Sequence, residues 1–102
     1  MNKESIESTI NKIINESYNP LYIELVNESF MHNVPAGSES HFKIVVVSQS
    51  FTDKTLIQRH KLIYKSLDTI MNLIHALSIH AFDKNEFDSN PMILDSPQCA
   101  NK

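Results

Sequence analysis

Histidine is the residue type in this sequence best suited to chemistry near neutral pH, because imidazole serves both as a base and as a metal ligand. A single cysteine, Cys99, accompanies five histidines. One cysteine excludes an internal disulfide and any all-cysteine metal site. No two histidines have the HExxH spacing of a helical metal motif, so a metal site has to be assembled from separate segments. The histidines are His32, His41, His60, His75 and His80.

Most of these histidines also have an interpretation that needs no ligand. His75 is expected on the apolar face of a strand and His60 on the apolar stripe of a helix, where a hydrogen-bonded core histidine is the default. His41 starts a strand and is expected at an exposed edge, whereas His80 points to the face opposite His75. His32 lies within a long loop and has no packing role there, which makes it the strongest ligand candidate by sequence alone.

Catalysis and nucleotide binding find little support in the sequence. Gly37 is the only glycine, and a Walker loop, a dinucleotide fingerprint and a GxxG nucleic-acid clamp each need at least two. No serine or cysteine lies in a recognisable nucleophile motif. We therefore expect a protein that is not an enzyme.

Charge is distributed unevenly along the chain, although the net charge is only −3. Residues 1–42 carry six acids and two bases (net −4), and residues 66–102 carry five acids and two bases (net −3). Residues 43–65 carry five bases and one acid (net +4). Such bases usually form a solvated face, and the alternative is a phosphate-contacting surface on a helix. The five bases are Lys43, Lys54, Arg59, Lys61 and Lys65.

Hydrophobic periodicity predicts the elements that must position these residues. Apolar residues at helical spacing predict a helix over residues 3–17, capped by Asn2 and ended by Asn19-Pro20. A capping-box pattern predicts a second helix over residues 55–70, with a stripe of Leu56, His60, Ile63, Leu67 and Ile70. Alternating residues predict strands at residues 21–26, 42–48 and 75–82.

The α-β-β-α-β order indicates an α+β domain with one mixed three-stranded sheet and helices packed on one face. The first two strands are expected to be antiparallel neighbours, and the second helix suits a right-handed parallel crossover. The domain is predicted over residues 1–87, with a short turn or helix near 83–87, followed by a flexible C-terminal tail over 88–102. The loop at 27–40 is long for a hairpin, which favours a functional role.

Targeting signals are not visible in the sequence. No apolar stretch is long enough to span a membrane, and the first residues have no apolar signal region. We therefore expect a cytoplasmic protein without a membrane partner.

Several motifs together resemble the BolA family. They are residues 31–42 (MHNVPAGSESHF), 45–48 (VVVS), 56–64 (LIQRHKLIY, which includes His60) and 74–80 (IHALSIH), and the tail adds 96–99 (SPQC). The resemblance implies a class II KH-like fold and no enzymatic activity. The family often has a glycine before the second helix, where this chain has Thr52-Asp53-Lys54. Asp tolerates a left-handed turn, so little change is expected.

The resemblance also implies partnership with a monothiol glutaredoxin and a shared [2Fe–2S] cluster, formed only in that complex. The glutaredoxin cysteine and a bound glutathione would hold one iron, and residues of this chain the other. By position these ligands are His75 and the loop residue His32, with His41 as the alternative. Imidazole replaces thiolate on one iron of Rieske centres, so the assignment is chemically sensible.

A second role implied by the resemblance is transcriptional regulation linked to stress, cell shape and biofilm formation. Promoter DNA would then contact the basic residues Arg59, Lys61, Lys65 and Lys43. The acidic net charge and the missing GxxG clamp count against strong binding. Both roles stay open from the sequence, as does the formation of a homodimer.

Overall fold

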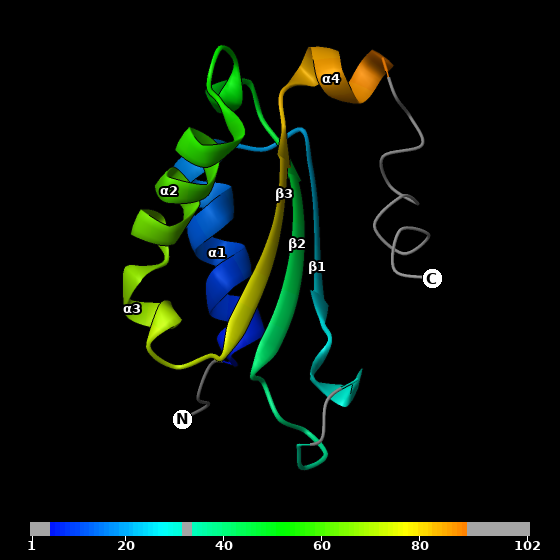
Figure 1. The fold of residues 1–102 in the computed structure, drawn as a ribbon, viewed down its shortest axis with the longest axis vertical. Coiled ribbons are helices and arrows are strands. Elements are labelled where there is room, and N and C mark those ends of the chain that lie inside the picture. The colour runs from blue at the N-terminus through cyan, green and yellow to red at the C-terminus, as the bar shows by residue number, and fades with distance from the viewer. Residues whose placement is uncertain (1–4, 32–33, 90–102) are drawn as a thin grey trace.

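A three-stranded sheet covered by helices on one face forms the protein (Figure 1). The computed structural model describes residues 5–31 and 34–89. The elements follow the order α-β-β-α-β, with a short helix added after α2 and another at the end. Their bounds are α1 Ile6–Tyr18, β1 Tyr22–Asn27, β2 His41–Val47, α2 Leu56–Ser66, α3 Asp68–Met71, β3 Ala76–Phe82 and α4 Lys84–Ser89, with 3₁₀ turns at Ser29–Met31 and Gln49–Phe51.

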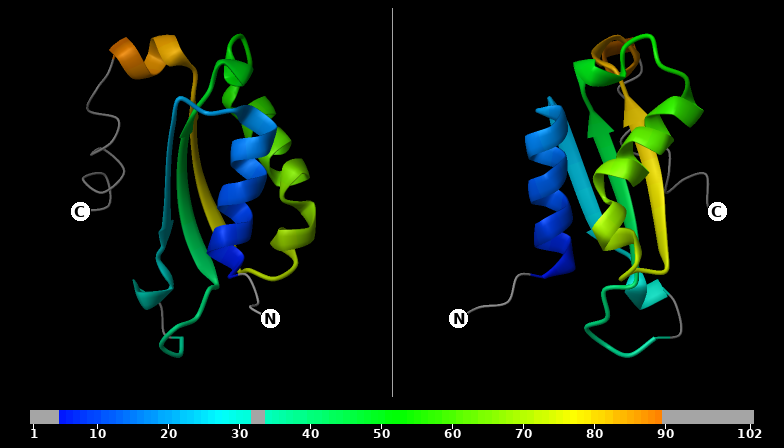
Figure 2. Two further views of the ribbon diagram at one scale, coloured as in Figure 1. Left: turned by 180° about the vertical axis from the view of Figure 1, so that it is seen from behind. Right: turned by 90° about the vertical axis from the view of Figure 1, so that its left-hand side faces the viewer.

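The sheet has the predicted mixed topology. Its strand order is β1-β2-β3, with β1 antiparallel and β3 parallel to β2. In the two further views α1 lies over the β1 side of the sheet and α2 over the β3 side (Figure 2). This arrangement confirms the predicted α+β, class II KH-like fold with helices on one face. It also places the starts of β2 and β3 side by side, because parallel strands run in the same direction.

The core lies between the helices and one face of the sheet. β2 contributes Phe42, Ile44 and Val46, and β3 contributes Leu77, Ile79 and Ala81 to the same layer. Each set lies on one face of its strand, because alternate residues of a strand point to the same side. Burial of these side chains is the main force that fixes the strand register.

The first helix begins later than predicted. Ser5 is its N-cap and accepts a hydrogen bond from Ser8 N at 3.0 Å, whereas the predicted cap, Asn2, lies outside the described residues. Glu39 also accepts from Ile6 N and Glu7 N, each at 3.1 Å. A carboxylate at a helix N-terminus satisfies free N–H groups and complements the helix dipole. The loop before β2 is thereby tied to α1.

The second helix differs from prediction in its length and its buried face. α2 ends at Ser66, and α3 follows after Leu67 departs from helical geometry (φ −101°, ψ 21°). Arg59 and Ile63 are its buried residues, whereas Leu56 of the predicted stripe is 61% exposed. The predicted stripe is buried at Ile63, Leu67 and Ile70, but it did not include Arg59, which was assigned to the polar surface. The turn before α2 matches its prediction, since Asp53 adopts φ +66°.

The end of the domain continues as α4 through Ser89, and so includes the first two residues of the predicted tail. Residues 90–102, the remainder of that tail and the location of Cys99, lie outside the described residues. None of the helices in the described part of the chain has the length and apolar character needed to cross a membrane.

Candidate functional site

Two histidines meet where β2 and β3 begin. His41 is the first residue of β2, and His75 directly precedes β3. Their ring centroids lie 5.5 Å apart with planes at 75°, an edge-to-face arrangement. The parallel register pairs His41 with Ala76, so the topology itself brings the two rings together. We call His41 and His75 the histidine pair.

Ser40 holds both members of the histidine pair in place. Its carbonyl oxygen accepts from His75 N at 2.7 Å and from Ala76 N at 3.2 Å. Its hydroxyl lies 2.7 Å from His41 Nδ1. Metal-bound imidazoles usually have an oxygen partner on the second ring nitrogen, which fixes the ring orientation. The contact with Ser40 gives His41 such a partner.

Ser29 supports this arrangement from the loop and was not identified from the sequence. The residue is buried, and its hydroxyl accepts from Ser40 N at 2.9 Å and from His41 N at 3.1 Å. Asn27 Oδ1 in turn accepts from Ser29 N at 3.0 Å, the local hydrogen bond of an Asx turn. The Asn27-Glu28-Ser29 sequence is the only signal that pointed to such a turn.

His75 differs from its default interpretation. The sequence placed it on the apolar face of the third strand, but β3 begins one residue later and His75 is exposed. A core role is therefore wrong, because the chain has not yet entered the strand at this residue. The predicted loop ligand His32 lies outside the described residues.

The other two histidines lie away from this pair. His60 is half-buried on α2, and His80 is half-buried in β3. Burial lowers the pKa of His80, the charges of Lys43 and His60 lower it further, and Glu28 opposes them. Within the described residues no three or more His, Cys, Asp or Glu side chains are arranged to hold a metal. The histidine pair therefore offers two ligands, half of a tetrahedral set.

Two of the predicted phosphate contacts are buried instead. Lys43 and Arg59 are each only 4% exposed. Lys43 lies in the central strand, where Val26 of β1 and Ser78 of β3 flank it in the register. Neither residue can be a main DNA contact, and this corrects the predicted basic face.

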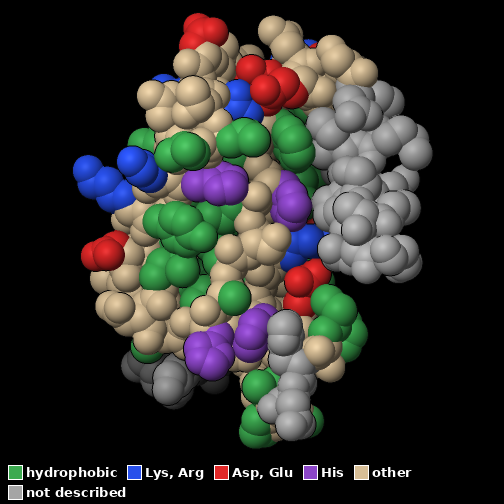
Figure 3. All heavy atoms as spheres, in the orientation of Figure 1, with side chains coloured by type: hydrophobic (Ala, Val, Ile, Leu, Met, Phe, Trp, Pro, Cys, Tyr) green, Lys and Arg blue, Asp and Glu red, His purple; other side chains and the backbone are tan. Residues whose placement is uncertain are grey.

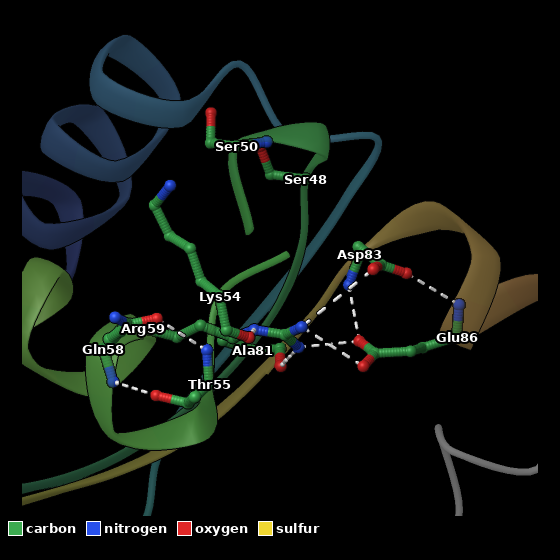
Figure 4. Close-up of polar contacts among 9 residues, drawn as sticks. All are labelled: Ser48, Ser50, Lys54, Thr55, Gln58, Arg59, Ala81, Asp83 and Glu86. Atoms are coloured by element: carbon green, nitrogen blue, oxygen red, sulfur yellow. Dashed lines mark hydrogen bonds and ion pairs between the residues drawn. The ribbon is translucent and has the colours of Figure 1, made fainter. Parts of the chain in front are cut away.

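Arg59 is a structural residue that connects α2, to which it belongs, with the turn before α2, the end of β3 and α4 (Figure 4). Its guanidinium donates to the carbonyl oxygens of Lys54 at 2.9 Å and of Ala81 at 3.0 Å. It also makes a two-pronged contact with Glu86, at 2.6 and 3.2 Å, and lies 4.0 Å from Asp83. Two-pronged guanidinium–carboxylate pairs are strong and directional. Arg59 thus fixes the turn before α2 and the end of β3 to α4.

The contact with Glu86 makes stability depend on pH. The hydrogen bond from Arg59 holds the pKa of Glu86 below its ordinary value of 4.5, although burial opposes the shift. A lowered folded-state pKa adds stability above the unfolded-state value, and this stability is lost as the pH falls through the folded-state pKa. The free energy of unfolding, measured in urea between pH 7 and pH 3, should therefore fall less for Glu86→Gln than for the wild type.

The control for this prediction is Glu16→Gln, a change at an exposed position on α1. Its pH dependence should follow the wild type. If the free energy of unfolding of Glu86→Gln falls with decreasing pH as steeply as that of the wild type, the role assigned to Glu86 is contradicted.

The remaining lysines border a shallow groove along α2. Lys54, Lys61 and Lys65 line it together with Gln58 and Leu62, and its volume is about 440 Å³. All three lysines are exposed, and Asp53 is the one acid in the lining. We call this feature the lysine groove. It retains Lys61 and Lys65 from the predicted basic face and adds Lys54.

The fold and the histidine pair together define a small KH-like domain that lacks the glycine clamp and has imidazoles at the start of two parallel strands. Residues 7–86 match the family model described as BolA-like protein. The chain belongs to the BolA-like family.

Curated relatives cover nearly the whole chain. It is 38% identical over 96 residues to the DNA-binding transcriptional regulator BolA of Escherichia coli K12, covering 92% of this chain and 91% of that protein. The protein of the same name from Vibrio cholerae is 42% identical with the same coverage. The solution structure of BolA1 from Mus musculus has a TM-score of 0.78 and 37% identity, covering 87% of this chain and 73% of that one.

Proposed function

We propose that this chain is a non-enzymatic regulator that shares a [2Fe–2S] cluster with a monothiol glutaredoxin through the histidine pair. The observation that carries the proposal is the 5.5 Å approach of His41 and His75 at the start of two parallel strands. Two neighbouring imidazoles, one on the first residue of β2 and one directly before β3, match the donor set that holds one iron of a Rieske-type cluster. The remaining ligands must come from another molecule.

The residues fit the cluster chemically. Nitrogen ligands on one iron raise the reduction potential above that of an all-thiolate cluster. His75 is exposed and therefore accessible to a partner surface. The Ser40 hydroxyl contacts the ring of His41 and the Ser29 hydroxyl accepts from its backbone N–H, so both serines hold His41 in place. Ligation requires neutral imidazole, so the affinity of the site should fall at acid pH.

The partner must supply thiolate ligands. The cysteine of a monothiol glutaredoxin and its bound glutathione meet this need, as the family resemblance implies. His32, the second ligand that the family motif implies, now becomes the alternative. We favour His41 as the partner of His75 because of its proximity.

Anaerobic mixing tests the proposal. The chain is combined with a monothiol glutaredoxin, iron, sulfide and glutathione, and followed by visible circular dichroism and gel filtration. We expect a heterodimer with a spectrum distinct from that of the glutaredoxin alone. An unchanged spectrum without a complex would overturn the proposal.

Binding to promoter DNA is a second candidate function, favoured by the lysine groove. Three exposed lysines, Lys54 in the turn before α2 and Lys61 and Lys65 on one side of the helix, can contact successive phosphates. Relatives that cover over nine-tenths of this chain are named DNA-binding transcriptional regulators. The two functions use different surfaces, so one protein can perform both.

Replacing Lys61 and Lys65 together by alanine should weaken DNA binding and flatten its salt dependence. Each lost phosphate contact removes about 0.9 from the slope of log K against log salt, or about 2 for both. Fluorescence anisotropy over a salt series measures this slope. The matched control, Lys12→Ala with Lys84→Ala, removes the same charge outside the groove, and an equal effect in both variants would exclude the groove.

A further inference from the structure

The outer edge of β3 has an open stretch of backbone. Ala76 N donates to Ser40 O, and Ser48 N donates to Phe82 O, so both residues direct their polar groups toward β2. Backbone groups alternate in direction along a strand. Ser78 and His80 therefore also face β2, whereas the backbone groups of Leu77 and Ile79 point away from the sheet.

Arg59 closes this edge at one end only. Its guanidinium donates to Ala81 O, which is the next outward carbonyl. The sheet ends at β3 in the described part of the chain, where no strand pairs with Leu77 or Ile79. The open stretch thus lies between the Arg59 contact and the histidine pair.

β3 also lacks the features that usually prevent pairing at an edge. Its sequence from Ala76 to Phe82 contains no Lys, Arg, Asp, Glu or Pro. Natural edge strands normally carry such residues to block association. β1, at the other edge, carries Glu24.

A row of side chains on α2 runs beside the open edge. Leu56, His60 and Tyr64 are four residues apart and so share one side of the helix. We call them the outer row. Leu56 is 61% and Tyr64 41% exposed. α2 lies over the β3 side of the sheet (Figure 2), and Arg59, which precedes His60, reaches the outward carbonyl oxygen of Ala81. Figure 3 shows hydrophobic (green) and histidine (purple) side chains together on the face that it draws.

We propose that the β3 edge and the outer row form the interface of a homodimer, with the two β3 strands paired antiparallel about Ser78. Leu77 of each copy then lies opposite Ile79 of the other, and their outward N–H and C=O groups bond reciprocally. The sheets join into one, as expected for an isologous two-fold contact.

A second copy fits this surface better than an isolated peptide. A short two-stranded ladder is marginal in water, so pairing needs added apolar burial. A second copy supplies both the identical open strand and the identical outer row. No formal charge lies on β3 or the outer row, so two copies meet there without like-charge repulsion.

Ser78→Lys is the sharpest test, because it places two ammonium groups opposite each other at the centre of the interface. Sedimentation velocity over a concentration series should show a monomer–dimer equilibrium for the wild type. Ser78→Lys should raise its dissociation constant at least tenfold, and so should Tyr64→Glu, a second variant outside the strand. Ser78→Thr and Ser8→Lys on α1 are the controls and should dimerise like the wild type.

Amide hydrogen exchange gives an independent readout. Protection of the Leu77 and Ile79 amides should rise with protein concentration, while the Ser78 and His80 amides, directed at β2, stay protected throughout and report that the fold is intact. A wild-type chain that is monomeric at every concentration, or a dimer that persists in both Ser78→Lys and Tyr64→Glu, overturns the proposal.

Discussion

His75→Ala is expected to abolish the shared cluster while leaving the domain folded. His75 is exposed and lies outside β3, so its removal opens no cavity in the core. In the proposed cluster it supplies one of two imidazoles, and one imidazole does not complete an iron site of the Rieske type. Visible circular dichroism of the variant mixed with glutaredoxin, iron, sulfide and glutathione should show the spectrum of the glutaredoxin alone.

The control for this variant is His60→Ala, which removes an imidazole from α2, away from the histidine pair. It should keep the spectrum of the mixed complex. Urea unfolding of His75→Ala should agree with the wild type within about 0.5 kcal/mol, as for surface substitutions generally. Retention of the mixed spectrum in His75→Ala would exclude this residue as a ligand.

Arg59→Ala is expected to be strongly destabilising rather than to act on DNA binding alone. The change removes the donor to the carbonyl oxygens of Lys54 and Ala81, and it removes the contacts with Glu86. A buried polar group left without its partner costs about 1–3 kcal/mol. Glu86 is partly exposed and regains water, so we expect a total loss of about 2–3 kcal/mol in urea unfolding.

Lys61→Ala is the matched control, since it removes an exposed cation from the same helix. It should cost less than about 0.5 kcal/mol. Equal and small losses in both variants would contradict the structural role of Arg59. Because of that role, a charge reversal at Arg59 is a poor probe of the DNA surface, and Lys61 and Lys65 are the residues to change.

The fold was predictable from the sequence because its strands have clear patterns. Phe42, Ile44 and Val46 alternate as a buried strand must, and the helix between the second and third strands has the length of a parallel crossover. The burial of Arg59 on α2 was not predictable in the same way. Arg59 is buried through hydrogen bonds to carbonyl oxygens distant in sequence, and periodicity carries no information on such contacts.

The candidate site was predictable in part. His41 and His75 precede or begin strands that were expected to run parallel, so their meeting at one edge follows from topology once the register is known. The register itself depends on core packing. The burial of Lys43 and the support from Ser29 depend on neighbours across the sheet and the loop, which no local pattern reveals.

Pulsed EPR of the reduced mixed complex tests the central claim most directly, because it detects nitrogen nuclei bound to iron. Two strongly coupled nitrogens are expected in the wild type, and both should be lost in His75→Ala and in His41→Ala, because neither variant holds the mixed cluster. His32→Ala should retain both couplings. Loss of a nitrogen coupling in His32→Ala but not in His41→Ala would identify His32 as the second ligand. The absence of strong nitrogen coupling in the wild type would contradict histidine ligation.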